Sequence, residues 1–174
     1  MLDASIGSNL TSVSASRELQ LLLERKRLPA LGINSYEFHK KSGKLIFQAC
    51  NSLYMCLDTG FNTTPLFPTE LRTCQYQDYS PIDPKICPQN SDLVAYVYGN
   101  DIYVTHSISG HDCRLTWTHG GKRNDPLSAG VPSYVMQEEF NRYHGFWWQP
   151  QSTDGIYRIC FEEVDESDVN IFTF

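Results

Sequence analysis

The stretch Leu93-Val-Ala-Tyr-Val-Tyr-Gly-Asn-Asp-Ile-Tyr-Val-Thr-His106 decides the fold of this chain. Its two runs of β-branched and aromatic residues, 93–98 and 102–106, flank Gly99-Asn100, as in two strands joined by a tight turn. A further turn at 109–112 and a third apolar run from Cys113 to Trp117 continue the pattern. The stretch therefore predicts an antiparallel meander.

Similar patterns occur before and after this meander. Upstream, alternation predicts three strands at 35–39, 44–50 and 53–57. Laying these runs over the central meander gives a weak internal repeat with an offset of 48 to 49 residues. That offset is close to one propeller blade, which has about 40 to 50 residues. Downstream, a third unit is expected at 146–148, 156–164 and 169–174, with a turn at 153–155.

Other segments connect or flank these units. Residues 1–16 are rich in Ser and Asn and predict a loose tail. Residues 17–28 favour a helix that Ser16 caps and Pro29 stops. Residues 59–88 hold five prolines and predict a long irregular connection. The fold class expected is mainly β, a partial β-propeller of about three incomplete blades with an N-terminal helix and a short inserted helix.

The inserted helix carries an adjacent carboxylate pair, Glu138 and Glu139. We expect it to run from Tyr134 to Tyr143 and to end at Gly145, with an apolar side made of Val135, Met136, Phe140 and Tyr143. Neighbours on a helix point about 100° apart, so the two acids converge on one small cation only near a helix end or on a single turn. Two carboxylates together match the three donors of an ammonium. The competing interpretation is an ordinary solvated helix face.

Composition limits the function classes. A net charge of −6 and a sequence pI of about 5.3 leave no basic stripe, which argues against nucleic acid as a partner. The N-terminus does not resemble a signal peptide and no apolar run approaches a bilayer span, so a soluble, cytoplasmic protein is expected.

The six scattered cysteines predict buried free thiols. His106, His111 and Cys113 lack metal-ligand spacing, and neither a metal nor a cofactor is expected.

The sequence offers no catalytic residue. It contains no Gly-x-Ser-x-Gly, and its five histidines stand in no recognisable triad order. We therefore expect the chain to be inactive as a hydrolase on its own.

Six motifs, in the same order, resemble the dipeptidyl peptidase IV family, and in particular its intracellular branch, dipeptidyl peptidases eight and nine. The resemblance covers roughly residues 17–174 and rests on Glu24-Arg-Lys-Arg-Leu28, Asp83-Pro-Lys-Ile-Cys-Pro88, Ser128-Ala-Gly-Val131, Gln137-Glu-Glu-Phe-Asn-Arg142, Gly145-Phe-Trp-Trp148 and Glu162-Glu-Val-Asp-Glu-Ser167.

The resemblance implies that residues 17–174 are a fragment of the N-terminal β-propeller of a serine dipeptidyl peptidase, without the α/β-hydrolase catalytic domain. In that family a glutamate pair clamps the free amino terminus of a peptide, a role that falls by position on Glu138 and Glu139. A propeller arginine binds a substrate carbonyl or carboxylate group, here Arg27, with Arg25 as the alternative. The resemblance also implies removal of Xaa-Pro dipeptides and, for the full-length protein, a homodimer.

Two residues depart from the family pattern, and two other functions stay open. Asn141 stands where the family has Asp, and Pro29 follows the arginine segment where a small or aliphatic residue is usual. The first alternative function is a non-catalytic propeller module, a truncated product or pseudoenzyme that binds peptides or proteins. The second is a propeller scaffold whose glutamates bind nothing.

Overall fold

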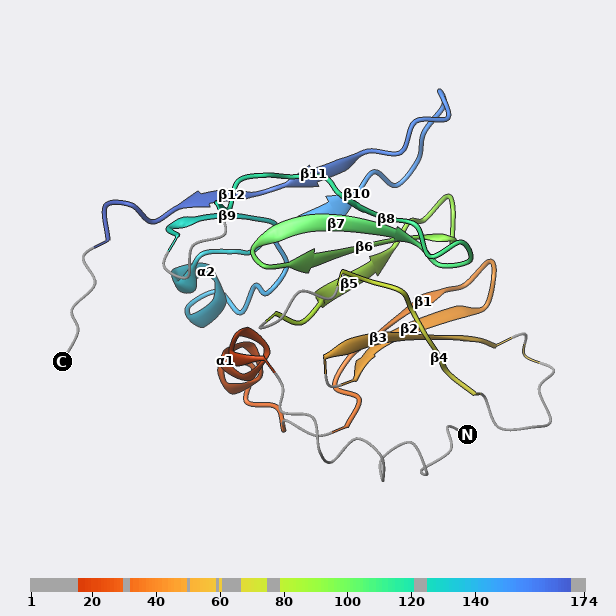
Figure 1. Ribbon diagram of the computed structural model, residues 1–174, viewed down its shortest axis with the longest axis horizontal. Helices are drawn as coiled ribbons and strands as arrows, with labels where there is room; N and C mark the ends of the chain where they lie inside the picture. The colour runs from red at the N-terminus through yellow and green to blue at the C-terminus, as the bar shows by residue number, and fades with distance from the viewer. Residues whose placement is uncertain are drawn as a thin grey trace.

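The structure is a computed structural model that describes residues 16–29, 32–49, 51–58, 60, 67–74, 79–120 and 125–169. Its elements form two four-stranded antiparallel sheets, two two-stranded sheets and two short helices (Figure 1). Their bounds are α1 (Arg17–Arg25), β1 (Tyr36–His39), β2 (Lys44–Ala49), β3 (Ser52–Leu57), β4 (Thr69–Glu70), β5 (Ile82–Ile86), β6 (Leu93–Tyr98), β7 (Asp101–His106), β8 (Asp112–Arg114), β9 (Leu127–Ala129), α2 (Tyr134–Glu138), β10 (Phe146–Trp148), β11 (Ile159–Phe161) and β12 (Glu163–Asp165). The expected tail at 1–16 lies outside the described residues except for Ser16.

The central meander is present as predicted and forms the sheet β5-β6-β7-β8. Gly99 and Asn100, which join β6 to β7, have φ angles of 54° and 62°. Two positive φ angles define the hairpin turn whose twist matches that of the flanking strands. The run from Cys113 to Trp117 is a shorter strand than expected, because β8 ends at Arg114.

The upstream meander forms the sheet β1-β2-β3-β4, and the internal repeat is confirmed. β6 begins 49 positions after β2, at Leu93 against Lys44, and β7 begins 49 positions after β3. Both sheets therefore place their two central strands at matching sequence positions. This spacing and the meander topology are those of successive blades of a propeller.

The prediction of an irregular connection at 59–88 is wrong for β4 and β5. β5 was missed because it contains Pro84, which has no N–H to donate to a ladder. The strand tolerates Pro84 since it lies at the sheet edge and its register with β6 shifts between Ile82 and Lys85. Asp83, inside this bulge, has a φ of 51°.

The core lies between stacked sheets. Val94, Tyr96 and Tyr98 point from one face of β6 into a cluster with Ile46 and Leu53 of the first sheet. From its other face, Ala95 and Val97 pack with Phe146 of β10. Both faces of β6 are therefore buried, which explains why its sequence is continuously apolar.

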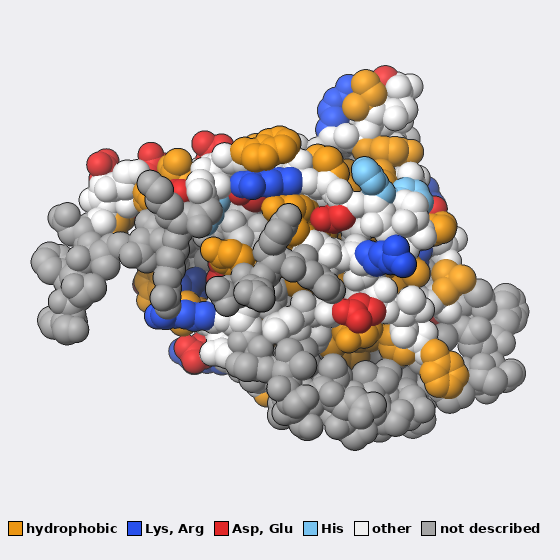
Figure 2. Space-filling view, viewed as in Figure 1, with side chains coloured by type: hydrophobic (Ala, Val, Ile, Leu, Met, Phe, Trp, Pro, Cys, Tyr) orange, Lys and Arg blue, Asp and Glu red, His pale blue; other side chains and the backbone are white. Residues whose placement is uncertain are grey.

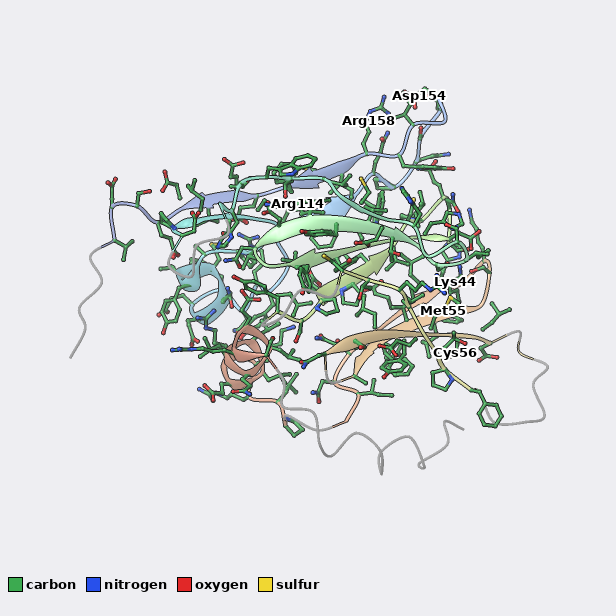
Figure 3. The ribbon with its side chains drawn as sticks, in the orientation of Figure 1. Lys44, Met55, Cys56, Arg114, Asp154 and Arg158 are labelled. Carbon is green, nitrogen blue, oxygen red and sulfur yellow. The ribbon has the colours of Figure 1, made fainter. Side chains whose placement is uncertain are left out.

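A buried lysine also joins the two four-stranded sheets. Lys44, 6% exposed, starts β2, and its Nζ donates to Asp92 Oδ1 at 2.6 Å, Ser91 O at 2.8 Å and Ser107 Oγ at 2.8 Å. In Figure 3 it lies near the turns that flank β6 and β7. All three of its donors thus serve the contact between the sheets.

The third unit is more divided than the sequence suggests. β10 pairs with β11, whereas β12 pairs with β9, and residues 170–174 lie outside the described residues. The hairpin between β10 and β11 projects from the body, with Asp154 and Arg158 near its tip (Figure 3).

The cysteines bear out only part of the prediction. Cys56, Cys74, Cys87, Cys113 and Cys160 are free thiols, and Cys50 lies outside the described residues. Cys113 and Cys160 are exposed, so burial was predicted wrongly for them.

Within the described ranges, no helix has the length and apolar character needed to cross a bilayer.

Candidate functional site

The arginine segment forms the C-terminal end of α1. Ser16 caps the start of the helix, as expected, by accepting from the Leu19 N–H at 3.3 Å. The helix ends earlier than predicted, at Arg25, because the Leu28 N–H bonds to Leu23 O and the Arg27 N–H to Glu24 O, both at 2.9 Å. These two bonds form a Schellman motif, which ends the helix before Pro29 is reached.

Arg27 occupies the left-handed position of that motif, with a φ of 54°. Glycine usually fills this position, because a side chain there is sterically strained. The Arg27 side chain is exposed. The local fold therefore holds a strained arginine at the surface, directly after the helix.

The glutamate pair lies at the C-terminal end of α2. Glu138 is the last helical residue and Glu139 is the C-cap, so the pair is at a helix end, where two adjacent carboxylates can converge. Both residues are exposed. No ion pair or side-chain hydrogen bond joins either carboxylate to another group in the part of the chain that is described.

The helix is shorter than the predicted 134–143, and Gly145 does not end it. Asn141 has a φ of 51° and the Arg142 N–H bonds to Met136 O at 3.0 Å, so the chain leaves the helical path before Tyr143. Asparagine tolerates this conformation well, which gives a local reason for Asn141. The predicted apolar side is wrong for Val135 and Phe140, which are 55% and 66% exposed.

Direct contacts join the two helix ends. Arg25 Nη1 donates to Gln137 Oε1 at 2.9 Å, and the Arg25 guanidinium lies 5.2 Å from the centre of the Tyr134 ring. Tyr143 Oη donates to Arg25 O at 3.1 Å, and Lys26 Nζ lies 5.1 Å from the Tyr143 ring. In Figure 1, α1 lies beneath α2 at one end of the molecule. The fold therefore brings the arginine segment beside the helix of the glutamate pair.

These contacts distinguish the two candidate arginines, Arg25 and Arg27. The Arg25 side chain holds α2, whereas the Arg27 side chain is exposed and makes no hydrogen bond or ion pair with the described residues. Gln137 is the key residue that the sequence does not single out. It is 3% exposed and its Nε2 also donates to Pro132 O at 2.8 Å, so the buried side of the helix carries a polar side chain whose hydrogen bonds are satisfied.

The loop after α2 is fastened at several points. Arg142 Nη1 lies 2.6 Å from Glu162 Oε2 and donates to His144 O at 2.9 Å. His144 Nδ1 lies 2.6 Å from Asp83 Oδ1. At Gly145 an added Cβ would lie 2.5 Å from Gly130 C and O, so only glycine fits this backbone approach.

A mixed surface surrounds the site. Figure 2 shows basic, acidic and hydrophobic side chains together over α1 and α2. Tyr134 and Trp147 are 57% and 44% exposed, so both rings contribute to this surface. Trp148 faces the interior, and its Nε1 donates to Lys85 O at 3.0 Å.

Several cavities lie near the sheets and helices, and one of about 150 Å³ is lined in part by Arg25, Tyr134 and Gln137. Another, of about 80 Å³, lies under α1, and its mixed lining includes the titratable residues Lys26, Glu37, Asp83 and His144. Burial lowers the pKa of Lys26, and burial together with Asp83 raises the pKa of Glu37. A third, about 680 Å³ and largely apolar, lies between β7–β8 and β11 and is lined by none of the predicted site residues.

Comparisons with known proteins agree with the resemblance. A family model described as the dipeptidyl peptidase IV (DPP IV) N-terminal region matches residues 40–174. Dipeptidyl peptidase 8 of Mus musculus is 41% identical over 167 residues, which cover 90% of this chain and 18% of the mouse protein. Dipeptidyl peptidase 8 of Homo sapiens gives the same figures, and dipeptidyl peptidase 4 of Bos taurus is 43% identical over 82 residues, 47% of this chain and 10% of the bovine protein.

Among solved structures, dipeptidyl peptidase 4 of Porphyromonas gingivalis aligns with a TM-score of 0.42 at 12% identity, over 76% of this chain and 22% of that protein. The chain spans 18% of the length of the mouse and human relatives. The family expected from the six motifs is confirmed by the sequence comparisons. This chain belongs to the dipeptidyl peptidase IV family and corresponds to part of its N-terminal region.

Proposed function

We propose that this chain is the substrate-binding part of a serine dipeptidyl peptidase, in which Glu138 and Glu139 bind the free amino terminus of a peptide. The observation that carries the proposal is the contact between α1 and α2, through Arg25, Gln137 and Tyr143. It brings a cationic segment and an anionic pair to one end of the fold, so the polar groups of a short peptide backbone would find complementary partners there.

The carboxylates are suited to an ammonium ligand for two reasons. They are exposed, so they keep contact with solvent until a ligand arrives. A primary ammonium has three donors, and each charge-assisted bond contributes about 1.5 to 3 kcal/mol. An N-acetylated peptide has lost that charge and two of those donors, and it should bind much less tightly.

Arg27 is proposed as the contact for a substrate carbonyl or carboxylate. Its guanidinium can donate two parallel hydrogen bonds to such a group. Its strained φ of 54° is a second reason, since strain of this kind concentrates at binding sites. Arg25 is the weaker candidate because Gln137 already occupies its guanidinium.

The proposed clamp would also act as a ruler. Two extended residues span about 7 Å, so a bound amino terminus would present the bond after the second residue to a nucleophile at that distance. The nucleophile and the pocket for proline belong to an α/β-hydrolase domain, which we propose as the partner of this chain in a longer, cytoplasmic protein. Removal of Xaa-Pro dipeptides is the activity proposed for that protein, and the intact enzyme is proposed to be a homodimer.

The binding step can be tested on the 174-residue chain. Calorimetric titration with Ala-Pro and with N-acetyl-Ala-Pro should show much tighter binding of the free amine. The substitutions Glu138→Gln and Glu139→Gln should each weaken it roughly ten- to a hundredfold. Glu70→Gln, at an exposed acid on β4, is the matched control and should leave affinity unchanged. Equal binding of the two peptides would favour a scaffold whose glutamates bind nothing.

A second measurement separates the enzyme from a non-catalytic module. In a longer protein that contains this chain and a Gly-x-Ser-x-Gly segment, release of Ala-Pro from a peptide should be lost on Glu138→Gln. Amine-specific binding without hydrolysis by such a protein would instead support a peptide-binding module or pseudoenzyme.

A further inference from the structure

We propose that Asp83 and His144 form a positioning pair for the glutamates, and that protonation of His144 tightens amine binding by this site. The inference rests on the proposed function, and it names a form of regulation that the glutamates and arginines alone would not provide. Neither residue is proposed to touch the peptide.

The geometry connects β5 to the loop that follows the glutamates. His144 Nδ1 lies 2.6 Å from Asp83 Oδ1, and only a few residues separate His144 from Glu139. The side chain of Asp83 is 11% exposed and that of His144 is 54% exposed, so a buried acid holds a partly exposed imidazole. The loop is therefore attached to the sheet by an imidazole that can exchange protons with solvent.

Asp83 is itself held firmly. It lies in the β5 bulge with a φ of 51° and directly precedes Pro84, a combination that a non-glycine residue adopts only when its surroundings impose it. Lys85 Nζ lies 3.0 Å from Asp83 Oδ2 and also donates to Phe146 O at 2.6 Å. One carboxylate thus joins the bulge, the start of β10 and the loop after α2.

Charged groups from every neighbouring element face this pair. They are Lys26 from α1, Glu37 from β1, Lys85 from β5 and Arg142 from the loop. Asp83 and Lys85 influence the pKa of both Lys26 and Glu37, and His144 lowers the pKa of Glu37. The charge on His144 therefore acts on Glu37, which lines the cavity under α1.

Imidazole is the side chain that ordinarily gains or loses a proton between pH 5 and pH 8. Protonation places a full positive charge beside the Asp83 carboxylate and so adds coulombic attraction to the existing hydrogen bond. Because Lys85 already compensates Asp83, the gain is modest, about fivefold in affinity. Because this attraction holds the loop after α2 against β5 and so keeps the glutamates in their binding arrangement, amine binding should tighten as pH falls.

The test measures Ala-Pro affinity of the 174-residue chain from pH 5.5 to pH 8. At each pH the dissociation constant of His144→Gln is divided by that of wild type. Protonation of the peptide amine and of the glutamates affects both constants equally and cancels in this ratio. That ratio should be about 5 at pH 5.5 and close to 1 at pH 8. Asp83→Asn, which keeps a residue that tolerates positive φ, should remove the same pH-dependent component.

Two further variants make the test specific. His144→Lys keeps a cation at every pH in this range and should bind with the affinity of the protonated state throughout. His111→Gln, at an exposed histidine beside β8, should match wild type at each pH. Identical pH profiles for wild type and His144→Gln would overturn the inference.

Hydrogen exchange distinguishes failure of this inference from failure of the proposed function. Amides of residues 139–146 should exchange faster in Asp83→Asn and His144→Gln than in wild type, with or without peptide. Unchanged exchange together with amine-specific binding by wild type would overturn the positioning role alone. Loss of amine preference in wild type itself would overturn the proposed function and this inference with it.

Discussion

Arg27 shows how a single residue position combines strain with a proposed role. Its φ of 54° is one that glycine adopts freely and that costs an L-residue about 1 to 2 kcal/mol. The motif R-K-R at residues 25–27 revealed the charge, but nothing in it indicated which arginine would be strained. Backbone hydrogen bonds of the whole helix end decide that, and they depend on how far the helix runs.

A substitution at this position should separate stability from binding. Arg27→Gly should raise the free energy of unfolding by about 0.5 to 1 kcal/mol, because relief of strain exceeds the added entropy of the unfolded chain. Urea unfolding measures this change. Arg27→Ala is the matched control, since it removes the same side chain but keeps the strained φ. A rise of equal size in both variants would contradict the explanation.

A second prediction at this scale concerns Gly145. Gly145→Ala should destabilise the chain by about 3 kcal/mol or more, since its Cβ would lie 2.5 Å from the Gly130 backbone, which cannot simply rotate away. At Gly120 an added Cβ meets only the carboxylate end of Asp125, so Gly120→Ala is the control. Thermal unfolding of both variants checks the difference, and equal losses would show that the close approach is not what Gly145 provides.

At the scale of elements, strands were predictable where their own residues determine them. β6 and β7 were predicted because both faces of β6 are buried and the Gly99-Asn100 turn is encoded locally. β5 was not, because Pro84 suits only an edge strand with a bulge, and sequence alone does not show where an edge lies.

The same distinction applies to the site. The predicted helix of 134–143 placed Glu138 and Glu139 near its middle, whereas α2 ends at Glu138, because Asn141 adopts a positive φ and Gln137 is held by Arg25. That the arginine segment would serve the same site as the glutamates was implied only by the family resemblance. Periodicity does not report which distant helix ends meet, and the contact from Arg25 to Gln137 spans 112 positions.

Helix α1 should make stability depend on pH through Glu18. Burial raises its pKa from 4.5 to about 7, so between these values the folded state holds a proton that the unfolded state has lost. Stability should therefore be greatest below pH 4.5 with respect to this group and should fall as pH rises towards 7. Glu18→Gln should stabilise the chain at pH 8 by about 2 kcal/mol.

Urea unfolding at pH 5 and pH 8 measures the effect of Glu18. Glu24→Gln, at an exposed acid on the same helix, is the control and should change neither value by more than about 0.5 kcal/mol. The prediction would be contradicted if Glu18→Gln and Glu24→Gln lost the same stability as wild type between pH 5 and pH 8.

At the scale of the whole molecule, contacts between adjacent sheets determine how the elements are arranged. Lys44→Met keeps the apolar stem but removes the cation that Asp92, Ser91 and Ser107 share. Because Asp92 is about a third exposed, part of this loss is recovered by water, and a cost of about 2 to 3 kcal/mol is expected. Lys41→Met, in the exposed turn nearby, is the control for denaturant unfolding. Similar costs for the two substitutions would show that Lys44 does not join the sheets.

The regular distance of 49 positions between equivalent strands has a consequence for how such a chain can change its length. A slip of one residue inside a sheet would turn every buried side chain outward, because strand faces alternate with a period of two. Gain or loss of one complete four-stranded repeat leaves the register of every hairpin intact and changes only the number of sheets. Descendants of this sequence should therefore tolerate duplication of an entire repeat more readily than a short insertion within β6 or β7.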